Sequence, residues 1–262
     1  CLRALGSSIP SIEALNLPPV VVETSARPRG LVLVTGPTGS GKTTTLAALL
    51  DHINHTRSEH ILTIEDPIEF VYRSDRSMVH QRQLHEDTRS FANALRAALR
   101  EDPDVILVGE MRDLETIQLA ISAAETGHLV FGTLHTSSAA QTVDRMVDVF
   151  PPGQQTQIRV QLSGSLMAVF SQTLCRRDKP QPGEFGRVMA QEILINTPAI
   201  ANLIREGKTA QLYSQLQTGG ELGMQTLERA LANLVQTGAI SQAEAMTKAG
   251  KPGELNRLLG NS

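Results

Sequence analysis

The sequence predicts an α/β fold in which helices flank a sheet of mostly parallel strands. Four short apolar runs recur along the chain, at residues 31–34, 61–64, 105–108 and 129–134. Helical patterns of about 10 to 15 residues separate these runs, and such alternation is typical of parallel strands joined by crossover helices. The chain has 262 residues, 40% of them hydrophobic, which is enough for one sizeable core and a smaller appended unit.

Composition argues against several classes of function. The formal net charge of -3 gives no support to a broad nucleic-acid surface, so we expect no nucleic-acid partner. No apolar run is long enough to span a bilayer and no secretory signal opens the sequence, so we expect no direct membrane insertion. Cys1 and Cys175 form no spaced pair, which is typical of a reduced cytosolic protein without structural zinc.

The first apolar run leads into a phosphate-binding motif. Residues 36–43 fit G-x-x-x-x-G-K-[ST], and a helix with Leu46, Leu50 and Ile53 on one face follows through about residue 54. A glycine turn with a chance lysine is the plainer alternative, but a strand, a glycine-rich loop and a helix in this order favour phosphate binding. The predicted nucleotide-binding residues are Gly36, Pro37, Thr38, Gly39, Ser40, Gly41, Lys42, Thr43 and Thr44.

Each part of this loop has an expected chemical role. Its glycines allow positive φ, which turns backbone N–H groups towards phosphate oxygens. Lys42 is expected to reach the β- and γ-phosphates, and Thr43 to place its hydroxyl on Mg²⁺. The helix N-terminus adds a partial positive charge. ATP and Mg²⁺ are therefore the predicted cofactors.

Helix-capping residues and helix-ending glycines predict the elements outside the loop. Residues 1–28 are predicted to be a remnant and a linker, with one helical turn near residues 11–15, and the start at Cys1 suggests a piece of a longer protein. Asp87 or Thr88 is expected to cap a helix that carries Phe91, Leu95 and Leu99. Asp113 is expected to cap the next helix, which Gly127 ends.

The sequence after residue 135 has a different character. Ser137 or Ser138 opens one predicted helix, and a second begins near Gln154 and carries Ile158, Leu162, Leu166 and Val169 on one face. Residues 176–187 are predicted to be an exposed hairpin loop, and residues 188–195 its return strand. From Pro198 onward, short amphipathic patterns with glycines between them predict a helical end-piece.

Polar residues follow each predicted parallel strand, namely Lys42, the group around Glu65, Glu110 and His135. Because ligands of such sheets gather at the carboxyl ends of the strands, we expect these residues to form one site. Glu110 is expected to hold Mg²⁺ partly through water, although an ordinary acidic residue is the alternative. The acids Glu65, Asp66 and Glu69 offer a catalytic base, and the residue pattern does not choose among them.

Histidines and arginines supply further candidates. His135 lies between Thr133 and Thr136 and is expected to sense a γ-phosphate, whereas His128 could equally cap the preceding helix. His52 and His55 have no third ligand near in sequence, so no zinc is expected there. The candidates for stabilising transferred charge across a subunit boundary are Arg82, Arg96, Arg100 and Arg112, although most helix arginines only line a solvated face.

Four stretches resemble the type II/type IV secretion ATPases, and most closely the PilT-type retraction ATPases of type IV pili. Residues 36–43, 64–70, 99–113 and 124–136 are similar to that family's Walker A, Asp box, Walker B and His box, and the resemblance extends from about residue 7 to residue 250. It implies a catalytic base at Glu69, a Mg²⁺-side acid at Glu110, and box histidines at His128 and His135.

The resemblance also implies the organisation of the protein. Expected are a remnant of an N-terminal domain and linker at 1–28, a RecA-like P-loop ATPase core at 29–196 and a C-terminal helical region at 197–262. The family works as a homohexamer on an inner-membrane pilus platform protein and the pilin machinery, at the cytoplasmic face of the inner membrane. Because the working site takes groups from outside this core, we expect the chain alone to bind ATP and hydrolyse it slowly.

The resemblance favours a motor for pilus retraction and twitching motility. Residues 199–206 resemble the retraction motors' AIRNLIRE signature, with Ala201 where that signature has Arg. The alternatives are a related pilus-extension, type II secretion or accessory retraction ATPase, and a nucleotide switch that does not hydrolyse ATP. The extension and secretion relatives commonly carry a four-cysteine zinc module, and this sequence has no such spacing.

Overall fold

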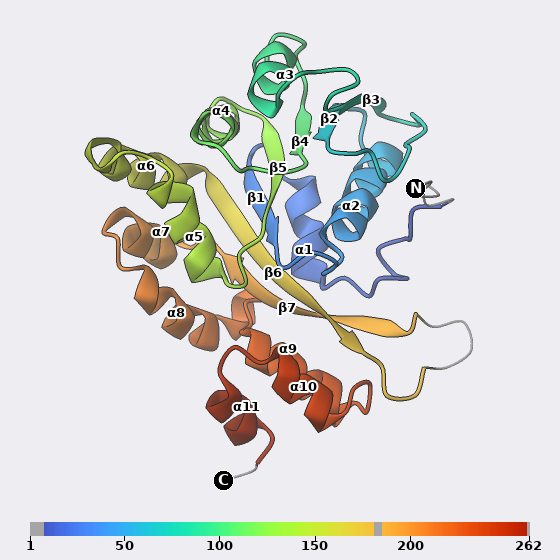
Figure 1. The fold of residues 1–262 in the computed structure, drawn as a ribbon, viewed down its shortest axis with the longest axis vertical. Coiled ribbons are helices and arrows are strands. Elements are labelled where there is room, and N and C mark those ends of the chain that lie inside the picture. Colours follow the sequence, from blue (N-terminus) through green and yellow to red (C-terminus); the bar gives the residue numbers. More distant parts are fainter. Residues whose placement is uncertain (1–7, 181–184, 261–262) are drawn as a thin grey trace.

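A seven-stranded sheet forms the centre of the molecule (Figure 1). The computed structural model describes residues 8–180 and 185–260. In these residues the strand order is β3-β2-β4-β5-β1-β6-β7, with only the β6–β7 pair antiparallel. This confirms the predicted α/β fold with a parallel-rich sheet. The strands are β1 Gly30–Thr35, β2 His60–Glu65, β3 Met78–Gln83, β4 Val105–Val108, β5 Leu129–Leu134, β6 Leu166–Arg176 and β7 Arg187–Ile195.

Helices cover both faces of the sheet (Figure 1). One face packs against α3, α4, α5, α6 and α7, and the other against α2 and the segment that contains Leu17 and Val21. A separate apolar cluster joins α9, α10 and α11 to the distal ends of β6 and β7. The helices are α1 Pro19–Glu23, α2 Lys42–Thr56, α3 Phe91–Ala98, α4 Leu114–Glu125, α5 Ala139–Asp148, α6 Pro152–Ser165, α7 Pro198–Arg205, α8 Leu212–Thr218, α9 Leu227–Gln236, α10 Gln242–Lys248 and α11 Pro252–Leu258.

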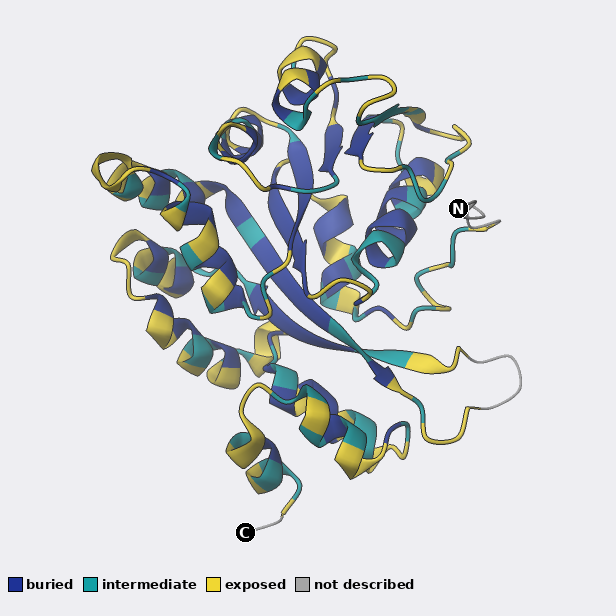
Figure 2. Cartoon of the chain, in the orientation of Figure 1, coloured by how far each residue is buried: buried dark blue, intermediate teal, exposed yellow. Residues whose placement is uncertain are grey.

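The central strands are buried from both sides. Every residue of β1, β4 and β5 is buried (Figure 2). Uninterrupted apolar runs are what a parallel strand covered on both faces requires. All four predicted parallel strands are therefore confirmed, and the return strand predicted at residues 188–195 is β7. No helix of the described residues has the length and apolarity that crossing a bilayer requires.

Several predicted details were wrong. Ser90, and not Asp87 or Thr88, caps α3, because its side chain accepts a hydrogen bond from the backbone N–H of Asn93. The polar stretch before α3 contains β3, an edge strand that the sequence prediction lacked. The helix predicted from Gln154 ends at Ser165, so Leu166 and Val169 lie in β6.

The other predicted caps and turns agree with the structure. Ser138, one of two candidates, caps α5, and Asp113 caps α4. Pro18 and Pro19 follow the turn near residues 11–15 and also begin α1, which was not predicted. Parts of three predicted segments, residues 1–7, 181–184 and 261–262, lie outside the described residues.

Candidate functional site: a phosphate-binding edge of the sheet

The loop between β1 and α2 has the backbone that the motif predicts. Gly41 has φ +90° and forms the N-cap of α2 in the left-handed region, where a residue with Cβ is strained. A Cβ on Gly36 would lie 2.2 Å from the backbone oxygen of Gln172 in β6. The loop thus lies tightly against β6 and directs the first turn of α2 towards the carboxyl edge of the sheet.

Lys42 folds back across this loop. Its Nζ donates to the backbone oxygens of Gly36 at 2.9 Å and Pro37 at 3.2 Å. Burial lowers the pKa of Lys42, and the nearby carboxylates of Glu110 and Glu69 oppose that shift. The ammonium therefore lies within the electrostatic reach of both acids that the sequence assigned to catalysis.

A small pocket brings the predicted catalytic acids Glu69 and Glu110 together with Thr43. It has a volume of about 70 Å³. The residues that line it come from the first turn of α2 and from the segments after β2 and β4, together with β5. Its polar lining includes Thr43, Glu65, Asp66, Glu69, Glu110 and Thr133. Four separate stretches of sequence thus meet at one edge, as the strand-end argument predicted.

The carboxylate of Glu110 contacts two nitrogen-bearing side chains. Its Oε1 lies 3.0 Å from Nε2 of His135 and also contacts Nε of Arg112. The side chain of Glu110 is 19% exposed, whereas that of Arg112 is 75% exposed. Hydrogen bonding to Glu110 raises the pKa of Arg112. The Glu110 carboxylate is therefore held in place by the residues that follow β4 and β5.

The three candidate bases differ in their environments. Glu65 is buried and accepts hydrogen bonds from Thr63 Oγ1 at 2.7 Å and Gln81 Nε2 at 3.1 Å. Burial raises the pKa of Glu65 despite these bonds. Asp66 is exposed, and Glu69 is half-buried on the lining of the pocket. Glu65 is thus held by structural contacts, while Glu69 faces the pocket close enough to influence Lys42.

The donor chemistry of this edge fits a magnesium ion that arrives with its nucleotide. In the described residues there is no group of three or more His, Cys, Asp or Glu side chains that could hold a metal ion. Mg²⁺ characteristically binds one or two protein oxygens plus substrate phosphates and waters. Thr43 supplies a hydroxyl and Glu110 a carboxylate to the same pocket, which is such a donor set.

Other predicted site residues lie elsewhere. His128 precedes β5, at the opposite end of the strand from His135, and its Nδ1 lies 3.0 Å from the backbone oxygen of Ala123. Arg82 pairs with Glu101 at 2.5 Å. Arg96 contacts Glu115, and Arg100 is exposed. Within this one chain, these histidine and arginine side chains do not line the pocket that contains Glu69 and Glu110.

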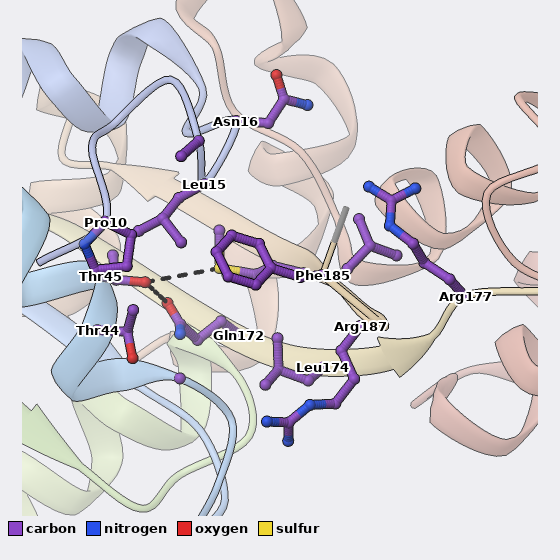
Figure 3. A pocket seen from close by; sticks show the side chains of 14 residues that line it. Pro10, Leu15, Asn16, Thr44, Thr45, Gln172, Leu174, Arg177, Phe185 and Arg187 are labelled. Atoms are coloured by element: carbon purple, nitrogen blue, oxygen red, sulfur yellow. Dashed lines mark hydrogen bonds between the residues drawn. The ribbon is translucent and has the colours of Figure 1, made fainter. Parts of the chain in front are cut away.

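A second, larger pocket lies on the other side of the first turn of α2 (Figure 3). It has a volume of about 260 Å³. Thr44 and Thr45 line it, and Figure 3 shows Gln172, Leu174, Phe185 and Arg187 around the same space. These last four come from β6 and the β6–β7 hairpin, far from the motif in sequence. No local motif indicates them, so the sequence prediction did not include them.

Together, the loop geometry, the folded-back lysine and the acids at the strand ends define a P-loop ATPase. The sequence pattern of the family described as type II/IV secretion system protein matches residues 18–247. The chain belongs to this family.

Individual relatives agree with that assignment. The chain is 60% identical over 250 residues to the type IV pilus retraction ATPase PilT of Pseudomonas aeruginosa, covering 95% of this chain and 71% of that protein. It is 58% identical over 247 residues to a twitching motility protein of Neisseria gonorrhoeae, covering 94% of this chain and 65% of the relative.

A solved structure confirms the fold. The crystal structure of the pilus retraction motor PilT with bound ADP matches with a TM-score of 0.90 and 53% identity, over 97% of this chain and 71% of that one. The Legionella pneumophila ATPase DotB matches with a TM-score of 0.83 and 31% identity, over 94% of this chain and 66% of that one. The fold is therefore the RecA-like ATPase core with a C-terminal helical region that the resemblance implied.

Proposed function

We propose that this chain provides the ATP-hydrolysing core of a motor for type IV pilus retraction, which disassembles pilin and drives twitching motility. The observation that carries the proposal is the meeting of Lys42, Glu69 and Glu110 at one edge of the sheet. The high identity to a pilus retraction ATPase supports the retraction assignment.

The P-loop residues 36–44 are the proposed phosphate site. Lys42 exchanges its bonds to Gly36 and Pro37 for the β- and γ-phosphates, and the backbone N–H groups at the start of α2 bind the remaining phosphate oxygens. The pocket beside Thr44 is large and apolar enough for the nucleoside. Thr43 and Glu110 are the proposed Mg²⁺-side residues, and the bound ion neutralises charge on the phosphates.

Glu69 is the proposed general base. A general base must lie within hydrogen-bond reach of the water whose proton it accepts. Glu65 accepts two side-chain hydrogen bonds in a buried site, which suits it to holding the segment after β2 in place. Glu69, half-buried in the same pocket, is better placed to accept a proton from water near the γ-phosphate.

His135 and Arg112 are proposed to act through Glu110 and the γ-phosphate. Both contact the Glu110 carboxylate, so a phosphate that arrives beside them offers each N–H donor a second anionic partner. His128 is proposed to act only across a subunit boundary, because it lies at the other end of β5. Its role requires the homohexamer, in which a neighbouring chain supplies groups to each site.

The proposed partners are five further copies of this chain, the inner-membrane pilus platform protein and the pilin machinery. This assembly would place the motor in the cytoplasm, at the inner face of the inner membrane. A related extension, secretion or accessory retraction ATPase is the second candidate, since the chain is also 39% identical to the type IV pilus ATPase PilU of Pseudomonas aeruginosa.

Two measurements test the proposal. Mg²⁺-dependent phosphate release from ATP tests hydrolysis, and its absence from an assembled sample would favour a nucleotide switch. Imaging of pili in cells that lack the protein tests the direction of force. We expect pili that extend and fail to retract, whereas a failure to extend would contradict the retraction assignment.

A further inference from the structure

The side chain of Gln172 connects β6 to the P-loop and to the first turn of α2. In the β1–β6 register Thr35 pairs with Ser171, so Gln172 lies beside the point where the chain leaves β1 and enters the loop. Gln172 is 2% exposed. Its Nε2 donates to the backbone oxygen of Ser40 at 2.9 Å. Its Oε1 accepts from Thr45 Oγ1 at 3.1 Å (Figure 3).

These two contacts flank Lys42 in sequence. Ser40 precedes the lysine by two residues, and Thr45 follows it by three, on the first turn of α2. One planar amide that donates on one side and accepts on the other fixes the loop relative to the helix. A carboxylate could not donate to the Ser40 oxygen, and an aliphatic side chain could make neither bond.

A second glutamine side chain donates a hydrogen bond to the amide of Gln172. Gln191 in β7 is also 2% exposed, and its Nε2 donates to Gln172 Oε1 at 3.2 Å. The backbone oxygen of Gln191 accepts from Gln225 Nε2 at 2.9 Å. Gln225 directly precedes Thr226, the residue that caps α9. Three glutamines therefore form a continuous connection from the P-loop to the C-terminal helices.

We propose that Gln172 is a positioning residue for nucleotide binding, held by Gln191, that keeps the P-loop in the shape that binds phosphates. The inference rests on the proposed function, because it assumes that ATP binds at this loop. The P-loop binds through the directions of its backbone N–H groups, so a small rotation of the loop relative to α2 weakens several contacts at once.

Equilibrium titration of ATP with Mg²⁺ into the purified protein tests the proposal. We expect Gln172→Leu to raise the Kd for ATP about tenfold, since a hydrogen bond on each side of Lys42 is lost. Gln191→Leu, which removes one bond to the Gln172 amide, should raise the Kd about threefold. Thermal unfolding without nucleotide is measured for each variant alongside.

Asn196→Leu is the matched control. The amide of Asn196 donates to the backbone oxygens of Ser163 at 3.0 Å and Leu166 at 2.7 Å, near the end of β6 that is far from the P-loop. It should lower the melting temperature and leave the Kd for ATP unchanged. A Kd within twofold of the parent for Gln172→Leu, with a loss of stability like that of the control, would overturn the proposal.

Two further outcomes are informative. If Gln172→Leu does not fold, the Kd of Gln191→Leu decides the question in the same way. If Lys42→Ala also keeps the parent Kd, ATP does not bind at this loop and the proposed function itself fails. When Lys42→Ala weakens binding and a folded Gln172→Leu keeps the parent Kd, the positioning role of Gln172 is contradicted and the proposed function stands.

Discussion

The carboxyl edge of the sheet, where the parallel strands end, and the amino edge, where they begin, carry similar residue types in different roles. At the carboxyl edge, the Glu110 carboxylate contacts Arg112 and His135, and the Lys42 ammonium lies near two acids. At the amino edge, His128 hydrogen-bonds the backbone of the preceding helix, and Asp104 accepts from the backbone N–H of His60 at 2.7 Å.

This difference separates function from structure. Polar side chains that bond to the nearby backbone fix the entry into a strand, so their loss lowers stability. Charged side chains that converge from different strands form a site whose partners a ligand can replace. We therefore expect substitutions at the carboxyl edge to change ATP binding and turnover, and substitution of Asp104 at the amino edge to change the free energy of unfolding.

The largest expected effect belongs to Lys42→Ala. The substitution removes the cation proposed to bind the β- and γ-phosphates, so the Kd for ATP should rise by about 100-fold or more. Fluorescence titration with a labelled ATP measures this. The thermal unfolding of the variant without nucleotide should stay close to that of the parent. A Kd within a few-fold of the parent value would show that the loop is not the binding site.

Glu69→Gln should nearly stop turnover while ATP still binds. The amide keeps the shape of the side chain and loses the proton acceptor, a change that typically costs about 100-fold or more in kcat. Steady-state phosphate release gives kcat, and the Kd for ATP serves as the control. If Glu65→Gln or Asp66→Asn reduces kcat far more than Glu69→Gln, then Glu69 is not the base.

Glu110→Gln should lower turnover and also change its metal dependence. Replacing the carboxylate by an amide removes a charged oxygen proposed to lie near Mg²⁺, so half-maximal activity should need about tenfold more Mg²⁺. A magnesium titration of phosphate release measures the shift. An unchanged half-maximal concentration would place the metal-side acid elsewhere on this edge.

Asp104→Ala tests the amino edge. It removes the acceptor for the backbone N–H of His60, so the free energy of unfolding should fall by about 1 kcal/mol with kcat unchanged. Urea unfolding measures the loss. Asp104→Asn keeps an acceptor oxygen and should recover most of the stability. A selective loss of kcat in Asp104→Ala would contradict the assignment of Asp104 to stability alone.

The buried carboxyl of Glu65 should make a small contribution to the pH dependence of the free energy of unfolding. Burial raises its pKa above the ordinary 4.5, so the folded state keeps a proton that the unfolded state has already lost. This contribution to stability is fully present below pH 4.5 and decreases as pH rises through the folded pKa. Glu65→Gln should therefore flatten the pH dependence of urea unfolding above this value, and an unchanged slope would contradict the assignment.

The sequence predicted the elements whose signals are local. The runs that became β1, β2, β4 and β5 are predominantly apolar, and in an α/β chain a short run of this kind is typical of a buried parallel strand. The edge strand β3 was missed because its half-exposed, polar residues lack that pattern. Leu162, Leu166 and Val169 keep helical spacing across the junction of α6 and β6, so spacing alone could not show where the helix ends.

Site residues, too, were predicted where their signal is local in the sequence. The motif residues and strand ends were predicted because each is marked in its own stretch of sequence. Gln172 was not, because its bond to Ser40 joins residues 132 positions apart, and the sheet order that brings them together is not visible in either segment. The separation of His128 from His135, by contrast, follows from the strand predicted at residues 129–134, which lies between them and became β5.

Hydrogen–deuterium exchange with and without ATP and Mg²⁺ tests the division between the two edges most directly. The backbone N–H groups of the P-loop would bind phosphate oxygens, so we expect slower exchange in residues 36–45 and 109–112. Residues 57–60 and 101–104, at the amino edge, should exchange at unchanged rates. Slower exchange at the amino edge without any change in the P-loop would contradict the account.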